Sequence, residues 1–210
     1  NLTSFVNLSC CVECHIVVAP IDKCIEHQQL RDRVVPTYAI RRQATGFQVP
    51  GYDEPYNKIY VYNSYYNPTY LSTIQAANVN VPQLSKWHQE TVDKHTAMVE
   101  QYAREHGFSE KLQKLATLHD IGKHFTVTVD EEGEHHFYGH EGVGAYLYLC
   151  AEAPTGELDE ATREMALMIQ YHSLAYSQNS KEAMMARLGA EMYQDLMQFS
   201  EADTKGAVRR

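Results

Sequence analysis

The sequence has no long apolar run, and this limits where the protein is expected to work. None of its 210 residues belongs to a stretch of about 18 or more apolar residues, the length that a membrane-spanning helix requires. The polar start at residues 1–4 also lacks the basic flank and apolar core of a secretory signal. We therefore expect no contact with a membrane and a cytoplasmic location.

Cysteine is scarce and unevenly placed. The five cysteines are Cys10, Cys11, Cys14, Cys24 and Cys150. Cys11 and Cys14 have the spacing of half a zinc module, but no second pair follows at a suitable distance. We expect reduced thiols that bind no metal.

Positive charge is also in short supply. The net charge is −9, and residues 1–80 are balanced at six Lys/Arg against six Asp/Glu, so residues 81–210 carry the whole excess. Extended duplex nucleic acid requires a broad basic surface, which an acidic domain lacks. A small substrate, or a nucleic-acid end that is gripped locally, suits this charge balance better.

The first 80 residues alternate short strands and helices. Two runs rich in β-branched or aromatic residues, 15–19 and 59–62, are predicted strands. Between them we predict a helix over 21–35, a second helix that begins at Pro36, and a loop over 46–55. Residues 63–85 show little periodicity and are predicted to be a linker that packs through Tyr65, Tyr66, Tyr70 and Leu71.

From Trp87 onward the pattern becomes helical. Cap and stop residues such as Ser109, Gly107 and Pro154 help to define the ends of the predicted helices, which are 88–106, 109–120, 140–152, 158–173, 181–188 and 190–204. Two alternating segments around a glycine-containing turn predict a β-hairpin over 125–138. The fold is therefore expected to be mainly α.

Five of these helices each place a possible metal ligand on an apolar stripe. His119 follows Leu112, Leu115 and Ala116 at helical spacing, and the same pattern recurs elsewhere. The candidates are His95, His119, the adjacent Asp120, His140, His172 and Asp203. Because a buried carboxylate needs a cation or strong donors, convergence on a metal would satisfy all of them at once.

The ligand types limit the metal. Imidazole with carboxylate suits Mn, Fe, Co, Ni or Zn better than an all-oxygen cage would, although Mg is kept as an alternative. The glycine and the cation that follow His119 and Asp120 suit a metal held beside a phosphate, and such an ion would make the water that it binds more acidic. Lys123, one helical turn beyond His119, is a candidate for binding the phosphate as a point charge, with an ordinary surface lysine as the alternative.

Other polar residues fit less well. His88, His106 and His124 fall off the apolar stripes and are interpreted as solvated side chains. His135 and His136 are neighbours on a predicted strand and point to opposite faces.

The motifs Lys94-His95-Thr96, Leu118-His119-Asp120-Ile121-Gly122-Lys123, Gly139-His140-Glu141-Gly142, Tyr171-His172-Ser173 and Glu201-Ala202-Asp203 resemble the HD superfamily of metal-dependent phosphohydrolases. The sequence of residues 118–123 and 139–145 looks most like the HD domains of bacterial tRNA nucleotidyltransferases. The resemblance implies a helical HD bundle with a small β-hairpin. His95, His119, Asp120 and Asp203 would form the single-metal set, His140 and His172 would serve a second metal, and Asp120 would be catalytic as the bridge, assisted by Lys123.

The segment before this bundle resembles the carboxy-terminal third of P-loop kinases related to polynucleotide kinase. The similarity rests on Cys24-Ile25-Glu26, Arg31-Asp32-Arg33-Val34-Val35-Pro36 and Ile40-Arg41-Arg42-Gln43. No G-x-x-x-x-G-K-[ST] motif is present, so no kinase activity is expected of this chain. The expected division is a kinase-like α/β fragment and linker over 1–80, and an HD domain over 81–210.

Together these features predict a phosphohydrolase that cleaves a phosphomonoester or a cyclic phosphodiester of a nucleotide or of a nucleic-acid end. A kinase half on a missing part of the protein would suggest RNA or DNA end healing, with removal of a 3′ or 2′,3′-cyclic phosphate. The alternatives are a nucleotidase, a dinucleotide hydrolase, and a non-catalytic module that senses a nucleotide.

Overall fold

The computed structural model describes residues 11–176 and 178–208. The polar start at residues 1–4 and Cys10 lie outside the described residues. The other four cysteines, Cys11, Cys14, Cys24 and Cys150, are free thiols. Among the described residues, no helix is long and apolar enough to cross a membrane.

The N-terminal segment contains two strands of a small sheet and the two helices that connect these strands. Strands β1 (Glu13–Val17) and β2 (Lys58–Tyr62) pair in parallel, and α1 (Ile21–Gln28) and α2 (Thr37–Thr45) connect them. This order of strand, two helices and strand agrees with the sequence prediction. A short strand, β5 (Gly156–Glu157), pairs antiparallel with the other edge of β2.

The predicted helix over 21–35 is too long. The helix ends at Gln28, and the five residues that follow it are all exposed. Without a buried face, the segment gains no packing energy that would extend the helix.

The predicted linker over 63–85 is wrong in its middle, where α3 (Tyr70–Ala77) forms. Ile74 is 2% exposed, and Tyr70 and Leu71 pack against the core, whereas Tyr66 is exposed. A helix of eight residues is marginal by itself, so its contact with α7 stabilises it. Sequence periodicity over two turns was too short to predict it.

The remaining helices form a bundle, and all of them except the short α6, whose last two residues were predicted to belong to the hairpin, correspond to helices that the sequence predicts. They are α4 (Val92–Glu105), α5 (Glu110–Leu118), α6 (Lys123–Thr126), α7 (His140–Glu152), α8 (Glu160–Tyr171), α9 (Lys181–Leu188) and α10 (Ala190–Lys205). Ser109 caps α5 as predicted, because its Oγ accepts a hydrogen bond from the amide of Leu112. The hairpin is also present, but its strands β3 (Thr128–Val129) and β4 (His135–His136) are shorter than expected.

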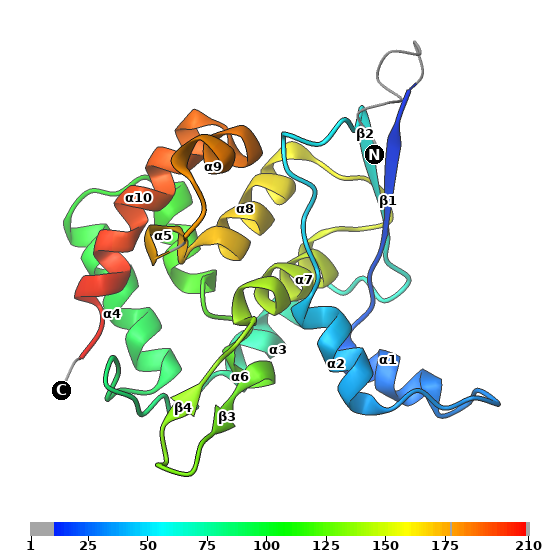
Figure 1. Cartoon of the computed structure of the whole chain (residues 1–210), viewed down its shortest axis with the longest axis horizontal. Coiled ribbons are helices and arrows are strands. Elements are labelled where there is room, and N and C mark those ends of the chain that lie inside the picture. The colour runs from blue at the N-terminus through cyan, green and yellow to red at the C-terminus, as the bar shows by residue number, and fades with distance from the viewer. Residues whose placement is uncertain (1–10, 177, 209–210) are drawn as a thin grey trace.

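Helix α7 lies in the middle of the molecule. Nine of its residues are buried, since α8 packs on one side while α2 and α3 pack on another. Figure 1 shows α4, α5 and α10 on one flank of this helix, and the sheet with α1 and α2 on the opposite flank. The start of α7 is therefore held between the bundle and the N-terminal layer.

The two predicted segments share one core. Buried apolar residues from both belong to a single cluster, which includes Val61 of β2 and Leu149 of α7. Asn63, just after β2, donates hydrogen bonds to the carbonyls of Cys150 and Ala153. A domain boundary near residue 80 remains a prediction, and the segments on its two sides do not form separate cores.

Candidate metal centre

The structure brings the six predicted ligands together from five helices. His95 lies on α4, His119 and Asp120 end the α5 segment, His140 begins α7, His172 follows α8, and Asp203 lies near the end of α10. His95, His119, Asp120 and His172 are at most 3% exposed. Each helix turns its apolar stripe inward, and the polar residue at the end of the stripe goes with it.

One group of ligands surrounds the Nε2 atoms of His95 and His119, which are 3.2 Å apart. Asp203 Oδ1 lies 3.0 Å from Nε2 of His95 and 3.6 Å from Nε2 of His119. Asp120 Oδ2 lies 3.2 Å from His119 Nε2 and 3.6 Å from His95 Nε2. Two imidazoles and two carboxylates thus converge on one point.

A second group uses the other oxygen of Asp120. Its Oδ1 lies 3.3 Å from His140 Nε2 and 3.8 Å from His172 Nε2, and these two nitrogens are 3.3 Å apart. Asp120 therefore divides its two oxygens between the two groups. This geometry suits a carboxylate that bridges two metal ions.

The hydrogen bonds of the four imidazoles leave Nε2 as the ligand atom. Each Nδ1 lies 2.8 to 3.1 Å from a backbone carbonyl oxygen, which can only accept a hydrogen bond, so Nδ1 carries the proton. The partners of His95, His119, His140 and His172 are the carbonyls of Gly206, Ala116, Phe137 and Ile169. Such bonds fix the tautomer and the ring orientation, as is usual for histidines that bind metals.

These residues fit a metal on physical grounds. Lone pairs on two Nε2 atoms 3.2 Å apart repel each other unless a proton or a metal ion lies between them. Asp120 Oδ2 is buried and, among the described residues, finds no well-aligned hydrogen-bond donor, although Lys123 Nζ is 2.7 Å away. A divalent ion would relieve both conditions.

The electrostatics favour the ligand forms of these side chains. Burial would raise the pKa of Asp120, but His119 and Lys123 hold it well below its ordinary value. Burial, reinforced by His140 and His119, lowers the pKa of His172 to about 4. Burial would also lower the pKa of His95, but its hydrogen bond to Asp203 leaves that pKa raised. In the absence of metal, a proton is thus drawn to the place where a cation would bind.

Two glycines allow the backbone to approach closely enough for this geometry. A Cβ on Gly122 would lie 2.1 Å from the carbonyl oxygen of His140 and 2.7 Å from the amide nitrogen of Gly144. A Cβ on Gly206 would lie 2.4 Å from a methyl carbon of Val99. Gly122 therefore brings the His119–Asp120 turn onto the start of α7, and Gly206 brings its carbonyl to His95.

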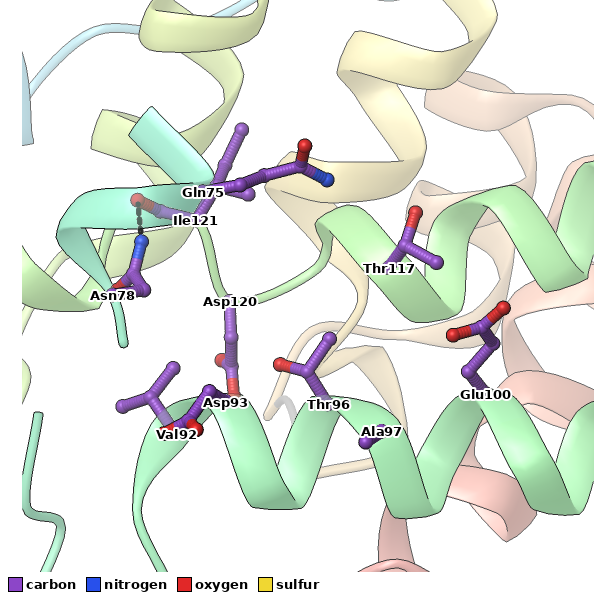
Figure 2. Close-up of a pocket in the computed structure, with 10 residues that line it drawn as sticks. All are labelled: Gln75, Asn78, Val92, Asp93, Thr96, Ala97, Glu100, Thr117, Asp120 and Ile121. Carbon is purple, nitrogen blue, oxygen red and sulfur yellow. Dashed lines mark hydrogen bonds between the residues drawn. The ribbon is translucent and has the colours of Figure 1, made fainter. Parts of the chain in front are cut away.

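Helix α3 supports the turn that follows Asp120. The side chain of Asn78 donates to the carbonyl of Ile121 at 3.0 Å and accepts from the amide of His124 at 3.1 Å. Figure 2 shows the Asn78–Ile121 hydrogen bond and the Asp120 side chain, which extends from the turn toward α4. A cavity of about 280 Å³ between α3, α4 and α5 opens beside this carboxylate.

A larger cavity of about 740 Å³ opens over the other side of the ligands. Lys123, His140, Glu141 and Asp203 contribute to its lining. Lys123 is only 6% exposed, so it is not the ordinary surface lysine of the alternative interpretation. Its role in binding phosphate remains a prediction.

Sequence patterns did not predict that three polar residues near the site, His88, Gln83 and Glu90, face inward. His88 was interpreted as solvated, but its ring packs against that of His95 and its Nδ1 donates to Glu90 Oε1 at 2.7 Å. Gln83 and Glu90 are buried beside it. Gln83 lies in the predicted linker, whereas His88 and Glu90 lie in the first turn of the helix predicted over 88–106. That prediction is wrong at its start, because α4 begins only at Val92, so helical spacing could not show that these residues face inward. His124 is also half-buried, whereas His106 is exposed as expected.

Two adjoining groups of imidazole and carboxylate inside a helical bundle define a metal-binding helical domain. Residues 92–203, just over half of the sequence, match the HD domain family, so the chain belongs to that family. HD domains are in general metal-dependent phosphohydrolases, although some are non-catalytic. No curated protein and no solved structure matches the chain. The likenesses to tRNA nucleotidyltransferases and to a kinase remain predictions.

Proposed function

We propose that this chain hydrolyses a phosphomonoester or a cyclic phosphodiester of a nucleotide or of a nucleic-acid end. The observation that carries the proposal is the lining of the 740 Å³ cavity, whose floor includes Lys123 and two of the ligands, His140 and Asp203, and whose exposed rim is aromatic. Cavities of roughly 300 to 1,000 Å³ are typical of small-molecule sites.

The rim suits a nucleobase. Trp87, Tyr138 and Tyr176 line the cavity and are 54%, 77% and 62% exposed. Exposed aromatic faces stack on bases and contribute about 1–3 kcal/mol per base. A substrate that carries a phosphate beside an aromatic ring would use both the floor and the rim.

The floor supplies the groups that phosphoester hydrolysis needs. His95, His119, Asp120 and Asp203 would hold one metal ion, and His140 and His172 with Asp120 would hold a second. Such ions would make water more acidic and neutralise charge on the phosphoryl group. Lys123 would donate to a phosphoryl oxygen from beside Asp120, and this charge-assisted bond would orient the phosphate.

Attachment to a polynucleotide would explain the arginines of α2. Arg41 and Arg42 are exposed, and Arg41 lies close enough to α6 to help lower the pKa of His124, after the larger effect of burial. Thr45, one helical turn further along, packs against Gly139 at the start of α7. We therefore favour a nucleic-acid end, with end healing by a 3′ or 2′,3′-cyclic phosphatase as the specific form. A kinase half on another part of the protein would complete that process.

Two other functions use the same site. A nucleotidase or dinucleotide hydrolase would need the cavity but not the arginines. A non-catalytic sensor would need the cavity but not a complete set of ligands, and the completeness of the set argues against it.

The test is metal analysis of the purified chain together with hydrolysis assays. Mononucleotides, 2′,3′-cyclic nucleotides, dinucleotides and oligonucleotides with a terminal phosphate would be compared under Mn, Ni, Co and Mg. We expect bound metal and phosphate release that Asp120→Ala abolishes. Binding of nucleotide without turnover under every metal would identify a sensor and refute the enzyme.

A further inference from the structure

We propose that Gln83 and Glu90 are positioning residues that hold the ammonium group of Lys123 where a substrate phosphate meets the metal centre. The inference rests on the proposed function, since it concerns the same cavity. It is carried by a buried chain of polar contacts that links Glu90, Gln83, Lys123 and Asp120.

The contacts in this chain allow only one arrangement. Lys123 Nζ donates to Gln83 Oε1 at 2.8 Å, and Gln83 Nε2 donates to Glu90 Oε1 at 3.2 Å. An ammonium can only donate and an ionised carboxylate can only accept, so the amide between them has a single orientation. Gln83 is 0% exposed, so no water competes for these bonds. The carboxylate of Glu90 therefore fixes the amide, and the amide fixes Lys123.

Glu90 is itself fully engaged. Besides Gln83, its Oε1 accepts from His88 Nδ1 at 2.7 Å. Its Oε2 accepts from the amides of Gln89 at 3.0 Å and Val208 at 3.1 Å. Four donors hold this carboxylate in place, and the bond to Val208 ties the segment after α10, which carries Asp203, to the segment before α4.

A fixed lysine is useful because a free one is costly to order. A lysine side chain has four rotatable bonds and loses up to about 2 kcal/mol of rotamer entropy when its ammonium group is held in place. Here the head group is already placed 2.7 Å from Asp120 Oδ2 and 2.8 Å from Gln83, with the ring of Phe137 on another side. Lys123 also lines the cavity, so a donor remains for a phosphoryl oxygen. The network would place that donor before the substrate arrives.

A double-mutant cycle tests this role. Gln83→Met, Lys123→Met and the double variant would be compared with the wild-type chain, all loaded with metal. The measurements are the affinity for inorganic phosphate, kcat and KM for the best phosphoester, bound metal, and Tm. We expect Gln83→Met to weaken phosphate binding about tenfold, the scale of one hydrogen bond to a charged group, with metal content unchanged. The double variant should bind phosphate no more weakly than Lys123→Met alone.

A matched control separates positioning from loss of stability. Asn63→Ala also removes a buried amide, which makes three hydrogen bonds, but it lies beside β2 and far along the chain from Lys123. It should lower Tm in a similar way without changing the affinity for phosphate. The exchange Gln83→Glu/Glu90→Gln should bind phosphate more tightly than Gln83→Glu alone. It replaces one of two facing carboxylates with an amide, while Lys123 keeps an acceptor at position 83.

The outcomes distinguish this inference from the proposed function. If the effects of Gln83→Met and Lys123→Met simply add, Gln83 acts on stability and the positioning role is refuted. If the wild-type chain does not bind phosphate, Lys123 is not a phosphate ligand and the inference also fails. If the chain binds phosphate but hydrolyses no ester, the enzymatic function is refuted, and the cycle in phosphate affinity still decides the positioning role.

Discussion

Replacing Gly122 with alanine should damage the second group of ligands while leaving the first intact. The new Cβ would lie 2.1 Å from the carbonyl oxygen of His140, whereas ordinary contact begins at 3.4 Å, so the two backbones must separate by about 1.3 Å. Both sides of this contact are backbone, and neither can rotate away. The start of α7, and His140 with it, would move away from Asp120.

The size of the effect follows from this displacement. Overpacking in a core costs roughly 1–3 kcal/mol. For a chain of this length, each kcal/mol lowers Tm by about 2–4 °C, so a loss of about 6–12 °C is expected if the cost is about 3 kcal/mol. A shift of about 1 Å in catalytic geometry costs on the order of 100-fold in rate.

The assay combines thermal unfolding, metal analysis and turnover. Gly46→Ala is the matched control, because its φ of −91° suits any residue and its nearest new contact is an ordinary 3.4 Å. We expect Gly122→Ala to lose metal from the second group and to keep the metal bound by His95 and His119. A Gly122→Ala protein with wild-type Tm and wild-type metal content would refute the argument that glycine is required for this close approach.

Three further predictions concern metal, substrate length and acid. Adding Mn or Co at about 100 times its dissociation constant should stabilise the metal-free chain against unfolding by about 2.7 kcal/mol, which a thermal-shift assay would measure. The same shift in the Asp120→Ala variant would contradict metal binding at the six predicted ligands. The double variant Arg41→Ala/Arg42→Ala should raise KM for a phosphorylated oligonucleotide but not for a mononucleotide. The control Arg104→Ala, at the far end of α4, should change neither KM. Equal effects of the double variant on both substrates would argue against a polynucleotide substrate. Asp159 caps α8 through Thr162, and although burial would raise its pKa, the bonds from Thr162 lower it. Asp159→Ala should therefore cost about 1 kcal/mol at neutral pH, and chemical denaturation should show this difference shrinking as pH falls below the unfolded pKa of about 4 and through the lower folded value.

The sequence could indicate which residues face the core but not how they meet. Helical spacing places His95 and His172 on buried stripes, and both are buried in the structure. The two oxygens of Asp120 serve two separate groups, and this division depends on how five helices pack. The carbonyl that fixes the His95 tautomer comes from Gly206, 111 residues away, and no local pattern contains that information.

The parts that were not predicted share one physical cause. Helix α3 and the segment that holds Gln83 and Glu90 owe their conformation to contacts with distant residues, such as Asn78 with Ile121 and Gln83 with Lys123. Propensity and periodicity describe local preferences, which tertiary contacts can override. The polar residues that support the site were therefore less visible in the sequence than the ligands themselves.

The small strand β5 also constrains the order in which the molecule can fold. Strand β2 pairs with β1, about 45 positions earlier, and with residues 156–157, almost 100 positions later. Contacts between residues so distant in sequence form slowly, and a chain is synthesised from its N-terminus. One edge of β2 therefore stays unpaired until residues 156–157, which follow α7, have been synthesised. The small sheet of this protein is therefore completed only after the helix that begins at His140 has been synthesised.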